Sequence, residues 1–188
     1  TWLQKGFIIG IGALLSLVIS LMSSRTPHFT KHDISPLLEP LELPNSGGLT
    51  LRTRLLVAPM TTYSSHDDGV ISQPELEYLA RRSRDPIGAV ITACAYVIRH
   101  GKAFHGQWAA DDDRCLPSLR AAAEAIHSNG AAAILQIHHG GRMCPVDLMP
   151  PEFPRPLAPS AVAASRGGST MDMPQAMTDA QIRETIAA

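Results

Sequence analysis

Three continuous apolar runs divide this chain, and each ends where polar residues begin. They cover residues 55–60, 87–97 and 131–137. A strand that is buried on both faces has such a run, whereas a half-exposed strand alternates apolar and polar residues. The pattern therefore predicts three fully buried, parallel strands.

Helices are predicted between these runs and after the last of them. The segment Ser72–Glu75 has the composition of a capping box, in which the serine hydroxyl accepts an N–H three residues on and the Glu75 side chain reaches back. A second helix covers residues 116–128 and ends at Asn129-Gly130, a typical left-handed cap. Another capping box, Thr178–Gln181, begins a third helix.

The order of these elements predicts an α/β fold. Strands that alternate with helices favour a parallel sheet with right-handed crossovers. Residues 41–43 and 49–51 flank a turn and are predicted to form a short hairpin, and residues 140–177 form a long loop rich in proline, glycine and serine. Three parallel strands leave sheet faces half covered, so we expect the chain to be the first part of a larger protein.

The first 24 residues form a hydrophobic leader, and residues 25–35 form a polar linker. Residues 6–24 carry no charge and are long enough to span a bilayer as a helix. Three interpretations compete for this leader: a membrane anchor, an uncleaved signal peptide, and sequence read upstream of the true start. Membrane contact through residues 6–24 is therefore one of the open expectations.

Composition excludes some classes of function. The chain has 188 residues, 45% of them hydrophobic, and 16 basic residues against 17 acidic ones. Such a balance offers no basic stripe for nucleic acid, so we expect no nucleic-acid partner. The three cysteines are odd in number and lack C-x-x-C spacing, which favours a reducing, cytoplasmic compartment over a disulfide framework.

Candidate chemistry lies where the apolar runs end. In α/β folds, functional residues gather beyond the carboxyl ends of the strands, and Thr61 and Tyr63 follow the first run directly. Gln136 lies inside the third run, where an unpaired amide would be costly, so a partner is expected for it. His138, His139 and Cys144 are zinc-ligand types, but no second ligand cluster has structural-zinc spacing, and no metal is expected.

Three motifs together resemble those of the old yellow enzyme family. They are Ala58-Pro59-Met60-Thr61-Thr62-Tyr63-Ser64-Ser65, Val90-Ile91-Thr92-Ala93-Cys94-Ala95-Tyr96-Val97 and Leu135-Gln136-Ile137-His138-His139-Gly140-Gly141-Arg142. Each motif ends a successive strand, and the match covers about residues 36–188. The family consists of FMN-dependent NAD(P)H:flavin oxidoreductases, or ene-reductases. The resemblance implies that residues 36–188 are the N-terminal portion of an FMN-binding TIM (β/α)8 barrel, truncated after about three strands.

The resemblance also implies a role for individual residues. Tyr63 would face the substrate, and Cys94 would be the small residue that touches the flavin at the end of the second strand. Gln136 would pair with the pyrimidine edge of the flavin ring, for which a glutamine amide supplies one donor and one acceptor in a plane. The cofactor-binding residues that the resemblance implies are Ala58, Pro59, Met60, Thr61, Cys94 and Gln136.

The activity implied by the resemblance is hydride transfer from NAD(P)H, through FMN, to an electron-poor C=C bond or a related acceptor of a small-molecule substrate. The family's substrate-binding histidine pair comes from a later strand, so no catalytic residue is expected in this chain, and Ala93 stands where the family usually has an acidic residue. Two alternatives remain open: a non-catalytic, membrane-tethered interaction module, and a metal-dependent barrel hydrolase that uses His138 or His139.

Overall fold

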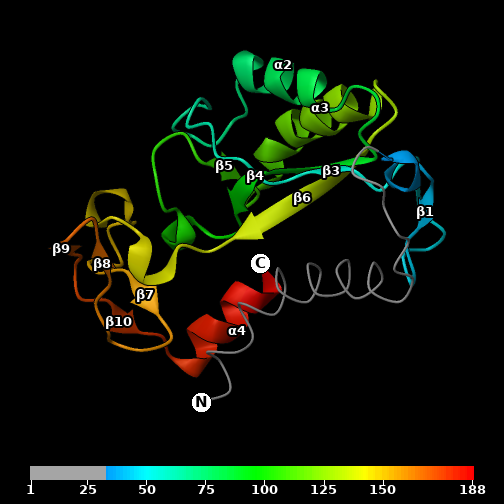
Figure 1. The fold of residues 1–188 in the computed structure, drawn as a ribbon. Helices are drawn as coiled ribbons and strands as arrows, with labels where there is room; N and C mark the ends of the chain where they lie inside the picture. Colours follow the sequence, from blue (N-terminus) through cyan, green and yellow to red (C-terminus); the bar gives the residue numbers. More distant parts are fainter. Residues whose placement is uncertain (1–32) are drawn as a thin grey trace. The chain divides into compact units, whose positions relative to one another are not determined.

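Four parallel strands form the central sheet of the computed structural model, which describes residues 33–188 (Figure 1). The central strand, β4, pairs with β3 near its start, with β5 near its end and with β6 along most of its length. The α/β fold with a parallel sheet, which the sequence predicts, is therefore present. The bounds of these strands are β3 (Leu56–Val57), β4 (Ala89–Tyr96), β5 (Trp108–Ala109) and β6 (Ala132–His138).

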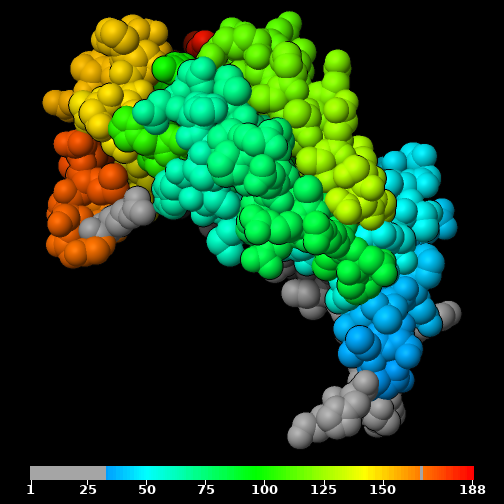
Figure 2. Space-filling view, turned by 90° about the horizontal axis from the view of Figure 1, so that it is seen from above, coloured from blue at the N-terminus to red at the C-terminus, as the bar shows by residue number. Residues whose placement is uncertain are grey.

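Two helices, α2 (Gln73–Arg82) and α3 (Leu116–His127), cover one face of this sheet (Figure 1). Seen from the helical side, their side chains form a continuous covering (Figure 2). Burial of apolar surface is the main stabilising contribution here, as in other small domains. The core between helices and sheet consists of Ile71, Leu79, Val90, Ala93, Ala95, Trp108, Ala122, Ile126 and Ala131.

The three predicted strands differ in how deeply they are buried. Strand β4 is buried over almost its whole length, as its apolar run predicts. The first run forms only the two residues of β3, and Ala58, Pro59 and Met60 are exposed, so the prediction of a fully buried strand over 55–60 is wrong. On β6, Leu135 and Ile137 are 43% and 67% exposed. Both strands flank β4 and, within residues 33–188, pair on one side only, which leaves their apolar side chains partly open.

The capping box at α2 is half correct. The Ser72 hydroxyl accepts the Glu75 N–H at 3.4 Å, as predicted. The Glu75 carboxyl does not reach back to Ser72; it binds hydroxyl groups of the segment that follows β3. At α4 (Asp179–Ala187) both halves of the predicted box are present, between Thr178 and Gln181.

The predicted N-terminal hairpin is confirmed as β1 (Leu41–Glu42) paired with β2 (Thr50–Leu51). The long segment after β6 is ordered by short strands rather than being a simple loop: β7 pairs with β10 in parallel, and β8 pairs with β9 as a hairpin. These strands are β7 (Leu157–Ala158), β8 (Ser165–Arg166), β9 (Ser169–Thr170) and β10 (Gln175–Ala176). Single 3-10 turns are Ser35–Leu37, Arg99–Gly101, Asp113–Cys115, Gly141–Met143 and Val146–Leu148.

Asn129 ties the carboxyl ends of α2 and α3 together. Its side-chain nitrogen lies 3.1 Å from the Ala80 carbonyl and 3.1 Å from the Ser83 hydroxyl, and Gly130 follows it with φ +78°, as the predicted left-handed cap requires. We expect Asn129→Ala to lower the free energy of unfolding by about 1–2 kcal/mol, because helix-end acceptors lose their donor. Urea unfolding of the variant measures this, with the exposed Gln73→Ala as control; equal stability of the two variants would contradict the assignment.

Within residues 33–188, no helix has the length and apolarity needed to cross a bilayer. The hydrophobic segment 6–24, on which the membrane expectation depends, lies outside the described residues.

Candidate functional site

A crevice lies where the segment after β3 meets the carboxyl end of β4. Thr61 and Tyr63 line it from the first element and Cys94 from the second, so three of the predicted site residues come together. Other residues that line this crevice were not singled out by the sequence for the site, among them Glu75, Phe104 and Gln107. Its position at the strand ends matches the usual location of functional sites in α/β folds.

Cys94 and Thr61 line the crevice together. The Cys94 thiol is only 8% exposed, and this burial raises its pKa, while hydrogen bonds from Thr61 and Gln107 act in the opposite direction because they stabilise the thiolate. The net direction is upward, so Cys94 is a neutral thiol at physiological pH. A small neutral side chain at this point allows close approach of a ligand to the strand.

Gln107 joins three segments of the site. It precedes β5 and is 1% exposed. Its carboxamide oxygen accepts the Ala103 N–H at 2.7 Å, and its nitrogen lies 3.1 Å from His138 Nδ1 and 3.5 Å from Cys94 Sγ. Because a backbone N–H can only donate, the Ala103 contact fixes which end of the amide is oxygen. The amide nitrogen therefore faces β4 and β6.

Tyr63 has an unusual backbone conformation for a residue of its type. Its φ is +57°, in the left-handed region that aromatic residues rarely adopt. Its ring is 59% exposed and lies against Phe104, with 4.8 Å between ring centroids. A Cβ atom on Gly106 would lie 2.9 Å from the Ser65 carbonyl oxygen, so the loop that carries Phe104 can approach this segment only with glycine there.

Glu75 is the central acceptor beneath this segment. Three hydroxyl groups approach its Oε2 atom, and the carboxyl is 1% exposed. Among the described residues, no Lys, Arg or His nitrogen forms an ion pair with it. The hydroxyl oxygens lie at 2.5 Å (Thr62), 2.7 Å (Ser64) and 3.3 Å (Ser65).

Gln136 lies one strand across from Cys94. The two residues are register partners in the β4–β6 pair, although Gln136 does not line the crevice. Its backbone N–H donates to the Thr92 hydroxyl at 3.1 Å, whereas its carboxamide has no hydrogen-bond partner among residues 33–188. The amide is half-buried and carries one donor and one acceptor in a plane.

Buried His100 and half-buried His139 form a hydrogen-bonded pair. The Gly141 N–H donates to His139 Nδ1 at 2.9 Å, so the proton of neutral His139 sits on Nε2, from which it is donated to His100 Nδ1 at 3.0 Å. Burial, with a smaller contribution from neighbouring histidines, lowers the pKa of His139 to about 4. The neighbouring His138 is not part of this pair, and its Nδ1 atom lies 3.1 Å from the Gln107 side-chain nitrogen. Within residues 33–188, no three His, Cys, Asp or Glu side chains are grouped to hold a metal ion.

The lowered pKa of His139 predicts a pH-dependent stability. Between the ordinary value of 6.5 and the folded value of about 4, the unfolded chain binds a proton that the folded chain does not. The free energy of unfolding should therefore fall, by about 2 kcal/mol, as the pH drops from 7 to 4.5. Denaturant unfolding at both pH values tests this. The decrease should be smaller in His139→Gln, and an equal decrease in both proteins would contradict the assignment.

Not all predicted site residues converge. Thr61, Tyr63 and Cys94 share the crevice, Gln136 lies beside it across the β4–β6 pair, and Ala58–Met60 form an exposed approach to it. Gln107 could not be found from the sequence, because β5 is too short to give a hydrophobic pattern. Glu75 had a signal, the run of hydroxyl residues after β3, but its capping-box spacing offered a competing role.

Solved structures with the same fold include old yellow enzymes. The homologue from Zymomonas mobilis superimposes with a TM-score of 0.69 and 24% identity over 80% of this chain and 42% of its own. The enzyme from Pichia sp. gives a TM-score of 0.71 and 24% identity over 80% of this chain and 39% of its own. These proteins are TIM barrels, and the described residues correspond to the first part of one.

Curated relatives agree with this comparison. A protein named as a probable NADH-dependent flavin oxidoreductase, YqiG of Bacillus subtilis, is 50% identical over 61% of this chain and 30% of its own length. The NADH:fumarate oxidoreductase of Klebsiella pneumoniae is 40% identical over 80% of this chain and 16% of its own. The chain thus spans less than a third of the length of these relatives.

The solved neighbours give the described residues the fold of part of a TIM barrel. The sequence pattern of the NADH:flavin oxidoreductase / NADH oxidase family matches residues 36–188. The chain belongs to that family, whose cofactor is FMN.

Proposed function

We propose that residues 36–188 supply one side of an FMN site in a protein that transfers hydride from NAD(P)H to an electron-poor C=C bond or a related acceptor. The observation that carries this proposal is the carboxamide of Gln136, which has no hydrogen-bond partner among residues 33–188 and lies one strand across from Cys94. FMN, when bound, supplies the two-electron chemistry that accepts and passes on the hydride. This chain supplies binding and orientation.

Each residue of the site has a distinct part in that binding. The Gln136 amide offers a donor and an acceptor to the pyrimidine edge of the flavin, and the Thr61 hydroxyl offers a polar contact to the same ring system. Because the Cys94 side chain is small, the ligand can lie close to the end of β4. The main chain of the exposed residues Ala58, Pro59 and Met60 contacts the ligand. Tyr63, the more exposed side chain, faces the substrate.

The test is the purification of the longest reading frame that contains residues 36–188. We expect a yellow protein whose flavin is released on denaturation and is identified as FMN, and whose visible absorption is bleached by NADH without oxygen. A colourless protein that gains no FMN on reconstitution would refute the proposal. The NADH:fumarate and NADH:acrylate oxidoreductases among the curated relatives make fumarate and acrylate the first acceptors to try.

A further inference from the structure

The segment after β3 combines a strained backbone with a buried carboxyl group. Tyr63, at the centre of this segment, has φ +57°, a conformation that only glycine adopts without strain. Residues in such conformations persist only where the surrounding structure fixes them strongly. The residues on both sides of Tyr63 provide that constraint, because the Thr62 and Ser64 hydroxyls both lie within 2.7 Å of Glu75 Oε2.

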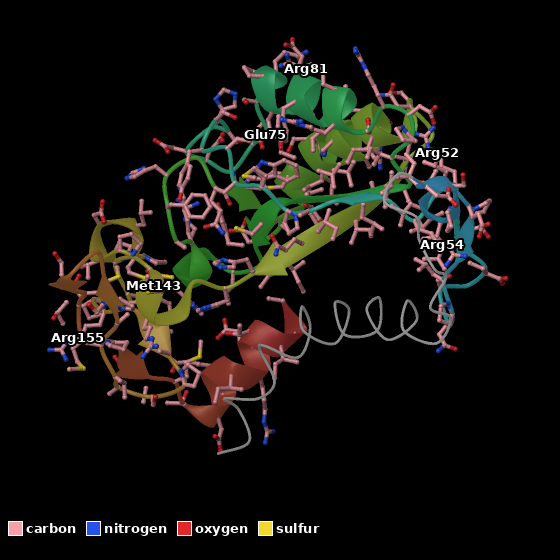
Figure 3. All side chains as sticks on the ribbon, viewed as in Figure 1. Arg52, Arg54, Glu75, Arg81, Met143 and Arg155 are labelled. Atoms are coloured by element: carbon pink, nitrogen blue, oxygen red, sulfur yellow. The ribbon has the colours of Figure 1, made fainter. Side chains whose placement is uncertain are left out.

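The constraint continues to either side. Ser65 also contacts Glu75 Oε2, at 3.3 Å, and its oxygen accepts the Ser72 N–H at 3.4 Å. Ser72 in turn caps α2, the helix whose first turn carries Glu75. Glu75 lies on the side of α2 that faces the sheet, whereas Arg81 of the same helix points away (Figure 3). Helix α2 therefore holds the Glu75 carboxyl in place, and the hydroxyl groups of the segment after β3 bind to it.

We propose that Glu75 is a positioning residue: through Thr62 and Ser64 it holds Tyr63 in the left-handed conformation that presents its ring, beside Phe104, to the substrate. The inference rests on the proposed function, since it gives Tyr63 a substrate to meet. Glu75 itself touches neither substrate nor cofactor in this scheme. Glu75 is 1% exposed and has no ionic partner among the described residues. In this proposal its role is to fix the conformation of Tyr63.

The experiment uses Glu75→Met, which keeps the side-chain length and removes the strong acceptor. The matched control is Glu77→Met on the exposed face of the same helix. In the FMN-loaded protein, reduction by NADH without oxygen gives an apparent Kd for NADH and a limiting rate. We expect the Kd to rise about 10-fold in Glu75→Met, because a misplaced positioning group weakens the productive complex, while FMN affinity and the control stay within twofold of wild type.

A double-mutant cycle separates positioning from general destabilisation. If Glu75 acts through Tyr63, Glu75→Met should add nothing further to the Kd once Tyr63→Ala is present, whereas independent effects would add. A crystal structure of Glu75→Met should show Tyr63 outside the positive φ range. Additive effects, an unchanged Tyr63 conformation, or a Kd equal to that of the control would overturn the inference.

Two further outcomes are distinguishable. Should Glu75→Met fail to fold, Ser64→Ala removes one donor at an exposed position: a raised Kd for NADH supports the inference, and an unchanged Kd overturns it. A wild-type protein that binds no FMN refutes the proposed function instead, and the φ of Tyr63 in the Ser64→Ala crystal structure still decides whether the hydroxyl contacts hold it.

Discussion

Gln136→Leu is expected to weaken FMN binding by about 100-fold. In the proposed site its carboxamide makes two hydrogen bonds to the flavin, each with a net free energy of about 1–1.5 kcal/mol, and leucine makes neither. Free Gln136 has no protein partner among residues 33–188, so the substitution breaks no side-chain hydrogen bond within the described protein. Binding should therefore suffer far more than stability.

The measurement is titration of the apoprotein with FMN, followed by flavin fluorescence. Gln73→Leu is the matched control, because Gln73 is an exposed glutamine on α2 and lines no part of the crevice. Both variants should unfold at the wild-type temperature. If Gln136→Leu binds FMN within threefold of the control, the assignment of Gln136 to the flavin fails, although the family assignment of the chain does not depend on it.

How far the sequence predicts this fold depends on element length. The eight residues of β4 and the helical spacing of α2 and α3 are long enough to give a pattern, and the parallel alternation follows from their order. Strand β5 has two residues and pairs with the last two of β4, so its formation depends on tertiary contact alone. The first and third apolar runs, which form β3 and β6, are less buried than the sequence predicts for a related reason. Hydrophobic periodicity does not show which strand of a sheet lies between two others.

The sequence predicts those candidate site residues whose type and position near the end of a strand together indicate their chemistry. Thr61 and Tyr63 follow the first apolar run and Cys94 lies near the end of the second, and they meet in the crevice because the carboxyl ends of parallel strands lie at one edge. Glu75 and Gln107 act in the site through side-chain contacts with residues 10 to 31 positions away, and their local sequence offers only a capping box for Glu75 and no signal for Gln107. Such long-range polar contacts form only when the chain folds.

Gln107→Leu is expected to lower the free energy of unfolding by about 3 kcal/mol. The substitution keeps the size of the side chain but leaves the Ala103 N–H without its acceptor and His138 Nδ1 without its donor, and each buried, unpaired polar group costs about 1–3 kcal/mol. Thermal and urea unfolding measure the loss. An effect below that of Asn129→Ala would show that water replaces both contacts.

The same amide sets the proton of His138. Its nitrogen can only donate, so His138 Nδ1 accepts, and burial lowers the pKa of His138, which keeps the ring neutral with its single proton on Nε2. Gln107→Glu preserves the acceptor for the Ala103 N–H but replaces the donor that faces His138 with an acceptor. Nitrogen NMR of the histidine rings should then show the His138 proton on Nδ1 and a raised pKa, because a nearby carboxylate favours the charged ring. His138 and Gln136 lie two residues apart on one face of β6. When the His138 proton moves from Nε2 to Nδ1, the Nε2 atom beside the proposed flavin contact therefore changes from a donor to an acceptor. FMN affinity should consequently change in Gln107→Glu even though Gln107 itself touches no flavin in the proposed site, and an Nε2 proton that persists in this variant would show that the amide does not control the tautomer.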